Sequence, residues 1–322
     1  MQAIVLILFC PCQSLVCDGT KQVRRGYAEP MARLGILHET RYSYARPVGF
    51  GAHRLLIRPR DSHAIRIVEA SLQTSLPGQT RWTYDAVGNC VCWFTPQGEA
   101  DGLTITSRLV IDRFPAPLTA LPIDDPHTIS PIVYSREDRA VLNPFITPAT
   151  DDDDRVLLRW LRQQMERPDE PAIEFLLRMN ATIHDSFAYK ARPEAGTQTP
   201  AETIASGEGT CRDFAWLMVE ALRRLGYAAV FATGYIYSGP TSALRGAGAT
   251  HAWCEVFLPG LGWTEFDPTN GLAESPDLIL VAHTRTPNEA KPISGTILDD
   301  PGEARLSVSV EVRLLDNLSA AA

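Results

Sequence analysis

The chain has 322 residues, a formal net charge of -8 at pH 7 and 45% hydrophobic residues, which is long enough for two domains and ordinary for a globular protein. An acidic chain lacks the basic surface that nucleic acids bind, and no apolar run is long enough to span a membrane. Seven cysteines in a chain of this size do not make a disulfide scaffold. We therefore expect no nucleic-acid or membrane partner.

The first 30 residues differ in character from the rest of the chain. Residues 3–9 are apolar, and a second short apolar run ends at Cys17. A secretory signal would have a basic region before the apolar run and an Ala-x-Ala site after it, and both are missing here. We expect residues 1–30 to be a poorly packed extension before a natural start at Met31, and the protein to be cytoplasmic. A true signal within residues 1–17 would instead mean export.

Residues 31–115 predict an antiparallel β domain. Short segments rich in β-forming residues recur, separated by turn residues such as Pro77 and Gly78, and residues 103–111 alternate strictly between apolar and other side chains. Short strands at this spacing predict a small antiparallel sandwich. The following residues, 116–149, contain many prolines and no period, which predicts a surface linker.

Residues 150–322 predict a second domain that begins with helices. Four consecutive aspartates follow Thr150, but a calcium-binding EF-hand loop would need spaced ligands, a glycine and a closing glutamate. We predict instead that Thr150 caps a helix over residues 151–166 whose first turn is acidic, and that a second helix covers residues 171–184. The alternating residues 305–315 predict a strand that we place in this domain, with its partner strand undetermined.

Residues 207–226 predict a helix with a cysteine in its first turn. Thr210 and Asp213 have the spacing of a capping box, apolar residues follow at helical intervals, and Gly226 ends the pattern. The N-terminus of a helix offers unpaired N–H groups and the positive end of the helix dipole, which favour the nucleophilic thiolate form of Cys211. Taken alone, Cys211 fits a small buried hydrophobic residue equally well.

A β-hairpin is predicted downstream, with its turn at residues 259–262. His251 opens the first strand and Asp267 closes the second, so a histidine and an acid are available to activate and orient a nucleophile. A turn centred on Pro259 would place the two side chains directly opposite, and other centres of the same parity would place them diagonally on the same face. Cys254 is an odd number of residues from His251, so we expect it to pack in the core.

Three linked segments resemble the bacterial transglutaminase-like superfamily, whose members are described as cysteine proteases. They are Gly-Thr-Cys-Arg-Asp-Phe-Ala at 209–215, His-Ala-Trp-Cys-Glu-Val-Phe-Leu-Pro-Gly-Leu-Gly-Trp at 251–263, and Phe-Asp-Pro-Thr-Asn at 266–270. The resemblance extends from about Leu34 to Leu315. It implies an α+β fold with a papain-like, transglutaminase-like core, in which the cysteine helix packs on an antiparallel sheet, preceded by the small β-sandwich.

The resemblance also implies a catalytic triad of Cys211 as nucleophile, His251 as base and Asp267 as the orienting acid. We therefore expect a cysteine-dependent acyl-transfer enzyme that acts on a peptide or protein substrate, with no metal or cofactor. Hydrolysis through a thioester on Cys211, as in a peptidase or amidase, is favoured. The alternatives are transfer of the acyl group to an amine, as in a transglutaminase or a peptide ligase, and a non-enzymatic peptide-binding module.

Two further segments near the predicted site remain open at this point. Residues 238–249 contain glycine and serine but no core pattern, and their position before His251 predicts a mobile rim of the cleft. Relatives often carry Gly-Arg-Asp-Tyr where this chain has residues 283–286, so the role of that loop is in doubt. Trp253 and Trp263 either line a substrate groove or pack around the hairpin.

Overall fold

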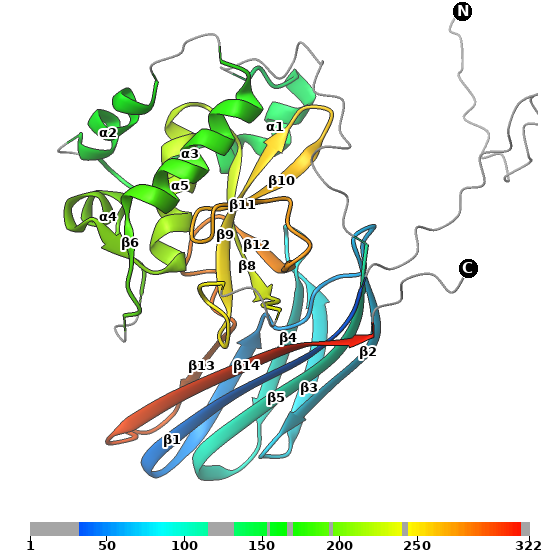
Figure 1. Cartoon of the computed structure of the whole chain (residues 1–322). Helices are drawn as coiled ribbons and strands as arrows, with labels where there is room; N and C mark the ends of the chain where they lie inside the picture. Colours follow the sequence, from blue (N-terminus) through cyan, green and yellow to red (C-terminus); the bar gives the residue numbers. More distant parts are fainter. Residues whose placement is uncertain are drawn as a thin grey trace, which may run out of the picture.

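The chain forms a β-sandwich and, above it in Figure 1, a mixed unit in which helices surround a second sheet. The structure is a computed structural model, and the predicted extension at residues 1–30 lies outside the residues that it describes. The described residues are 32–114, 132–152, 155–165, 170–192, 196–239 and 244–316.

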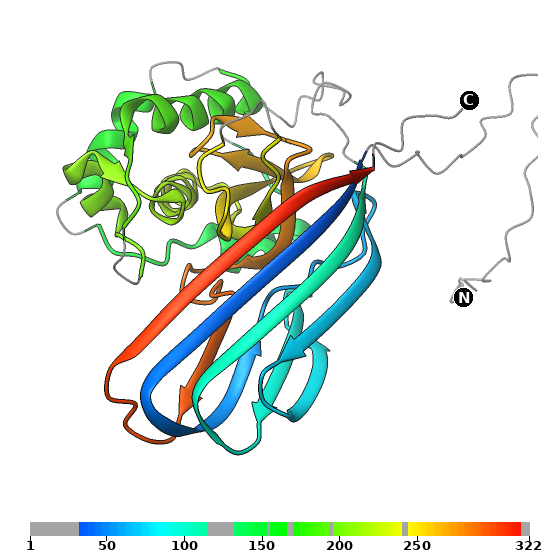
Figure 2. The same ribbon diagram turned by 60° about the horizontal axis from the view of Figure 1, so that its bottom comes forward.

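A single long strand, β1 (Ala32–Leu55), takes part in both layers of the sandwich. Its first part pairs antiparallel with β5 and β14, and its last part pairs antiparallel with β4 and β13. Figure 2 shows β14, β1 and β5 as long neighbouring strands. Alternate apolar residues such as Leu34 and Ile36 are buried, as the period of a half-buried strand requires, in a cluster that also contains residues of the mixed unit. The other strands are β2 (Ile65–Thr74), β3 (Gly78–Tyr84), β4 (Cys90–Pro96), β5 (Glu99–Arg113), β13 (Ile293–Ile297) and β14 (Ala304–Asp316).

The strand near the C-terminus belongs to the sandwich, which corrects its placement in the catalytic half. β14 pairs with β1 along nearly its whole length, with Ile36 opposite Val312 and His38 opposite Val310. The alternation in the sequence indicates which face of a strand is buried but cannot name the strand beside it. The N-terminal unit is therefore completed by residues that follow the mixed unit in the chain.

A helix lies within the segment predicted to be a linker. α1 (Arg136–Ile146) begins after Ser135, whose Oγ accepts a hydrogen bond from the N–H of Asp138 at 2.9 Å, and it buries Leu142 in the core of the mixed unit. The prediction of a surface linker at residues 116–149 is wrong for this part. It followed the high proline content of the segment and gave no weight to the Ser-x-x-Asp pattern that caps the helix. The earlier part of that segment lies mostly outside the described residues.

The mixed unit is built on a five-stranded antiparallel sheet with the order β11-β10-β9-β8-β12. Helix α5 (Cys211–Arg224) packs on this sheet, and its apolar side chains share one core with Cys254 and Val256. The α+β fold and the packing of Cys254 are thus as predicted. The remaining elements are α2 (Val156–Gln164), α3 (Ala172–Ser186), β6 (Ala188–Tyr189), α4 (Pro200–Ser206), β7 (Glu208–Gly209), β8 (Ala229–Ile236), β9 (His251–Leu258), β10 (Gly262–Asp267), β11 (Leu272–Ala273) and β12 (Leu278–Thr284).

Helix α2 begins later than the predicted start at Asp151. The carboxylate of Asp152 accepts hydrogen bonds from the backbone N–H groups of Leu157 and Leu158, each at 3.0 Å. This acid therefore caps the helix from the preceding loop instead of lying in its first turn. A run of acids before a helix carries the same electrostatic signal in both arrangements, so the sequence could not locate the boundary.

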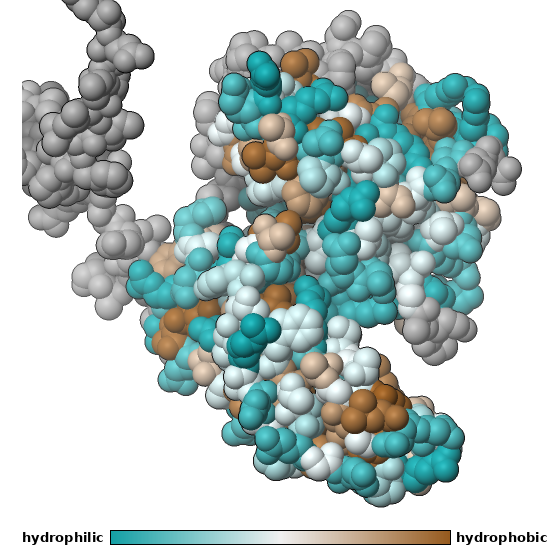
Figure 3. Space-filling model, turned by 180° about the vertical axis from the view of Figure 1, so that it is seen from behind, coloured by the Kyte–Doolittle hydropathy of each residue, from teal (hydrophilic) through white to brown (hydrophobic). Residues whose placement is uncertain are grey.

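The sandwich and the mixed unit share a hydrophobic interface. Tyr235 of β8 and Ile279 of β12 pack with residues of β1, β4 and β5. The Tyr235 hydroxyl donates to the carbonyl of Ile57 at 2.8 Å and lies 3.0 Å from Nδ1 of His38, whose pKa burial lowers to about 4. Figure 3 shows the back of both units as mainly hydrophilic, with exposed apolar side chains in small groups. The two units are therefore joined through their cores, which fixes the sheet that carries the candidate site.

Candidate active site

The first turn of α5 is held rigidly by buried polar contacts. Thr210 precedes the helix in an extended conformation, and its N–H and hydroxyl both donate to Oδ2 of Asp213 at 2.8 Å. Asp213 is fully buried and also accepts from Nη2 of Arg192 at 2.9 Å. A side chain at Gly209 would collide with Asp213, since an added Cβ would lie 2.9 Å from its Cβ. These contacts fix the first turn of α5 and with it the direction in which the Cys211 side chain points from the helix.

The hairpin brings His251 and Asp267 together diagonally. Leu258 pairs with Gly262, which centres the turn on Gly260 rather than on Pro259. This centre has the parity that keeps both side chains on one face. The Nε2 atom of His251 lies 2.9 Å from Oδ2 of Asp267.

The carboxylate of Asp267 is buried and surrounded by donors. Besides His251, it accepts from the N–H of Thr269 at 2.9 Å and from Nδ2 of Asn270 at 2.8 Å. Burial alone would raise the pKa of Asp267, but the charge of His251 and these hydrogen bonds together lower it. Asp267 is therefore ionised. The sequence analysis did not assign these roles to Thr269 and Asn270, although both belong to the recognised Asp-Pro-Thr-Asn segment.

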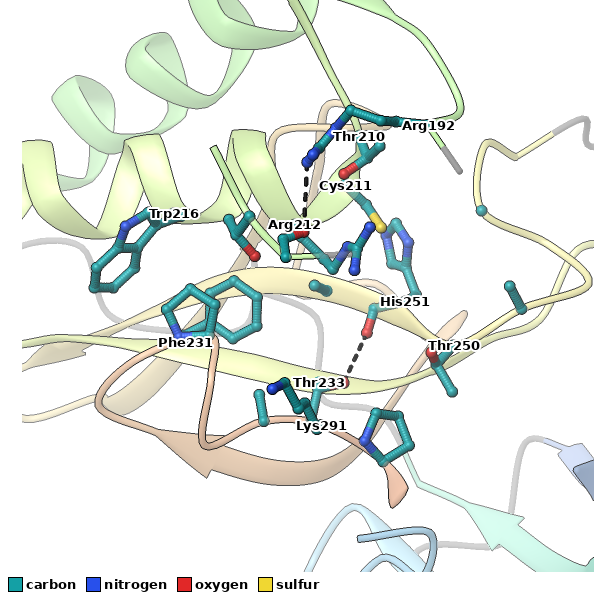
Figure 4. A pocket seen from close by; sticks show the side chains of 18 of the residues that line it. Arg192, Thr210, Cys211, Arg212, Trp216, Phe231, Thr233, Thr250, His251 and Lys291 are labelled. Atoms are coloured by element: carbon teal, nitrogen blue, oxygen red, sulfur yellow. Dashed lines mark hydrogen bonds between the residues drawn. The ribbon is translucent and has the colours of Figure 1, made fainter. Parts of the chain in front are cut away.

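The imidazole of His251 is oriented with its other nitrogen toward Cys211. Its side chain is fully buried, and within the described part of the chain Nδ1 makes no hydrogen bond of normal geometry. Figure 4 shows the sulfur of Cys211 beside this ring. Burial lowers the pKa of His251, but the charge of Asp267 and its hydrogen bond, together with the neighbouring Cys211, outweigh it and raise the pKa to about 10. The geometry thus favours an imidazolium next to the sulfur at neutral pH.

The loop before β9 covers the imidazole. Gly246 has φ +90°, and a Cβ there would lie 2.5 Å from Nδ1 of the ring, so only glycine fits. Arg245 exchanges two hydrogen bonds with Asn270, at 2.8 and 3.2 Å. The carbonyl of Gly248 accepts from the N–H of Val310 in β14 at 3.0 Å. The predicted rim is therefore held on one side by the Asp-Pro-Thr-Asn segment and on the other by the sandwich.

A cavity of about 600 Å³ opens in front of Cys211. Its walls come from the start of α5, from β8, from the loop before β9 and from the segment that leads to β13. Trp253 is absent from these walls because it is fully buried, stacking against His251 with ring centroids 6.1 Å apart. Trp263 packs instead against Phe257, so the packing alternative holds for both tryptophans. Sequence reasoning missed several lining residues: Tyr189, Arg192, Arg212, Trp216 and Lys291.

Two parts of the chain match known families. Residues 34–112 match the model of the bacterial transglutaminase-like N-terminal region, and residues 159–268 match the model of the transglutaminase-like superfamily. Residues 159–268 thus form a domain of the transglutaminase-like superfamily, preceded by the N-terminal region found in its bacterial members.

This transglutaminase-like protein is also similar to solved and curated proteins. A "putative cysteine protease" from Cytophaga hutchinsonii superposes with a TM-score of 0.67 at 19% identity, covering 88% of this chain and 91% of that one, which shows the shared fold. Uncharacterised proteins of Mycobacterium bovis and Mycobacterium leprae are 28% and 25% identical, covering 87% and 88% of this chain and 92% and 100% of their own. The superfamily and the fold support cysteine-dependent acyl transfer as the broad reaction class, without separating hydrolysis from transfer to an amine.

The loop at residues 283–286 joins the core of this transglutaminase-like protein to its cavity. Nε2 of His283 lies 2.6 Å from Oε2 of Glu255, and Thr286 lines the cavity. Among the described residues, no group of three or more histidine, cysteine, aspartate or glutamate side chains is arranged to hold a metal ion. No helix in the described part of the chain is long and apolar enough to cross a membrane.

Proposed function

We propose that this protein hydrolyses peptide or amide bonds through a thioester on Cys211. The observation that carries the proposal is the orientation of His251. One ring nitrogen is fixed on buried Asp267 at 2.9 Å, and the other has no hydrogen bond of normal geometry among the described residues and faces the sulfur at the cavity. A nucleophile, a base and an orienting acid in this order are the parts that covalent acyl transfer requires.

In the first half of the reaction, the sulfur of Cys211 attacks the carbonyl carbon of the bound amide. The backbone N–H of Cys211 in the first turn of α5 is one donor for the developing oxyanion. When the C–N bond breaks, His251 gives its Nδ1 proton to the leaving amine, and the acyl group remains on sulfur as a thioester. Asp267 keeps the ring oriented and stabilises its positive charge throughout.

In the second half, a water molecule attacks the thioester. His251 takes a proton from this water as the acid product forms, and the sulfur leaves as thiolate. An amine acceptor would use the same three groups and give an amide product, as in a transglutaminase or a ligase. We favour water because the cavity borders exposed residues such as Asn288 and Lys291 and water is the most abundant acceptor there.

Alkylation at low pH tests the activated thiol. At about pH 5–6 ordinary thiols are protonated and react slowly with iodoacetamide. We expect alkylation of Cys211 in the wild type, resolved at the peptide level by mass spectrometry, and its loss in Cys211→Ala with an unchanged circular dichroism spectrum. Cys254→Ala is the matched control, because burial raises the pKa of this thiol and keeps it unreactive. Equal total labelling of wild type and Cys211→Ala would contradict the proposal.

A peptide library incubated with a labelled primary amine separates the reaction branches. Cleaved or deamidated peptides that require Cys211 support hydrolysis, and amine incorporation that requires Cys211 identifies the transferase alternative. Peptides that bind without any conversion, in a protein whose Cys211 also fails to react, identify the non-enzymatic binding module.

A further inference from the structure

The cavity in front of Cys211 is lined by positive charge, although the whole chain is acidic. Arg192, Arg212 and Lys291 contribute side chains to its walls. The described residues that line it include neither aspartate nor glutamate. In a chain with a formal net charge of -8, this distribution is opposite in sign to the average surface. The positive charge of the cavity therefore comes from these lining residues and does not follow from the net charge of the chain.

One of the three cations is neutralised within the protein. Nη2 of Arg192 donates to both carboxylate oxygens of Asp213, at 2.9 and 3.1 Å, and the Asp213 side chain is fully buried. This pair serves the first turn of α5 and contributes little net charge to the cavity. The excess charge consequently comes from the other two side chains.

The side chains of Arg212 and Lys291 make no hydrogen bond or ion pair with any residue that the structure describes. Arg212 is half-buried and follows the nucleophile in α5, whereas the half-buried Arg54 forms an ion pair with Asp85 at 3.5 Å. Figure 4 shows Arg212 near Cys211 and His251, and Lys291 across the cavity beside Thr233. Two cations on opposite walls that have no carboxylate partner within the described parts of the chain leave a place for an anion between them.

The protonated His251 adds no net charge to this field, because its Nε2 is paired with Oδ2 of Asp267 at 2.9 Å. Asp267 is fully buried and does not line the cavity, so its own charge is compensated by the ring. Arg212 and Lys291 therefore remain the source of the excess positive charge. A cleft lined by charge of one sign with low-dielectric walls concentrates ligands of the other sign.

We propose that the acyl donor of this enzyme carries a carboxylate close to the scissile bond, and that Arg212 and Lys291 bind it. The substrate class is an acidic peptide, in which the carboxylate belongs either to an aspartate or glutamate side chain or to a free C-terminus. This inference rests on the proposed function, because it places the carboxylate relative to attack by Cys211. It adds a charge requirement that the triad alone does not impose.

Two alkylating reagents that differ only in charge test the field without a known substrate. Iodoacetate carries a carboxylate where iodoacetamide carries a neutral amide. The rate ratio of iodoacetate to iodoacetamide at Cys211 is expected to fall several-fold in Arg212→Gln and in Lys291→Gln, and about tenfold in the double variant. Arg136→Gln, which removes an exposed positive charge on α1 away from the cavity, is the matched control and should leave the ratio unchanged. An unchanged ratio in the double variant would overturn the inference.

Matched peptides then identify the source of the carboxylate. Pairs that differ by glutamate against glutamine, or by a free against an amidated C-terminus, are compared by kcat/KM in wild type and in Lys291→Glu. We expect the acidic member of one pair to be preferred in the wild type and to lose that preference in Lys291→Glu. Conversion of all members at equal rates would refute the charge requirement while leaving the proposed function intact. Failure of Cys211 to react with any peptide or either reagent would instead refute the proposed function.

Discussion

The two ends of helix α5 both carry buried charged groups, and they differ in how completely these groups are paired. At the C-terminal end, Glu220 accepts hydrogen bonds from the N–H groups of Ala149 and Thr150 and from Arg223 and Arg224. At the N-terminal end, Nδ1 of His251 beside the helix lacks a hydrogen bond of normal geometry to any described residue. The C-terminal end is a closed network, whereas the N-terminal end combines the closed contacts of Asp213 with a ring nitrogen of His251 that is open toward a cavity.

The difference separates stabilising charges from reactive ones. A buried ion pair that satisfies every donor and acceptor fixes one arrangement of the chain, and removal of one partner leaves an uncompensated charge. A buried ring with an unused nitrogen next to a thiol is costly for the fold unless it serves chemistry. We therefore expect substitutions at the C-terminal end of α5 to lower stability and substitutions at the N-terminal end to lower reactivity.

The largest effect is expected from Glu220→Ala, which breaks the closed network. It leaves the fully buried Arg223 without its carboxylate, and we expect a loss of about 3–5 kcal/mol in the free energy of unfolding. Urea unfolding followed by circular dichroism measures this. Arg212→Gln at the other end of the same helix is the control, with an expected change within about 0.5 kcal/mol. Equal losses in the two variants would remove the distinction between the ends.

The second largest effect is expected from Asp267→Asn, which removes the negative charge that is paired with His251 at the N-terminal end of α5. The pKa of His251 is raised to about 10, so its proton is held through neutral pH and the stabilisation it provides is lost as pH rises through that value. Without the carboxylate, the alkaline limb of kcat/KM, which reports the imidazolium that protonates the leaving amine, should move down toward the ordinary histidine range near 6.5, and kcat/KM should fall about a hundredfold. The pH profile of kcat/KM from pH 5 to about pH 11 checks this. Identical alkaline limbs in both proteins would contradict it.

A smaller effect is expected from Gly246→Ala, which adds a methyl group against the imidazole of His251 in the loop that covers it. Its Cβ would lie 2.5 Å from Nδ1 of His251, so the ring or the loop must move and Cys211 alkylation should slow about tenfold, which corresponds to about 1.4 kcal/mol. Gly248→Ala is the matched control, because its φ of +88° imposes similar backbone strain but its Cβ meets no atom within 4 Å. Similar alkylation rates in the two variants would show that the contact with the ring is unimportant.

The smallest effect is expected from Asn270→Ala. This change removes one donor to Asp267 and both contacts to Arg245, each bond being worth about 1 kcal/mol or less. We expect faster hydrogen exchange of the amides at Gly246 and Gly248, with a severalfold lower rate of alkylation at most. Unchanged exchange would mean that β14 alone holds the rim.

The reactive end of α5 could be predicted from the sequence because its signals are local. The cap pattern around Cys211 and the parity of the hairpin strands are encoded within a few residues of each site, and the turn centre was the only open choice. The contacts that hold the rim could not be predicted, since Asn270 and Val310 reach it from other parts of the chain. Arg212 could be named as a cation but not as an unpaired one, because pairing depends on the three-dimensional neighbourhood.

The sandwich shows the same limit at a longer range. The strand over residues 305–315 was predicted from its alternation, but its neighbour β1 lies near the opposite end of the described chain. Helix α1 was missed for a different reason, because proline density outweighed the cap at Ser135. Pattern and propensity thus define elements, while pairing between distant elements depends on the geometry of the folded chain.

The pairing of β14 has a consequence for the nascent protein. This strand follows every other described element, yet the N–H of its Val310 donates to the carbonyl of Gly248 in the loop over the His251 imidazole. During translation the ribosome releases the cysteine, the histidine and the aspartate before this strand emerges. In the growing polypeptide, Cys211, His251 and Asp267 are therefore present before the loop over the imidazole gains its hydrogen bond from Val310.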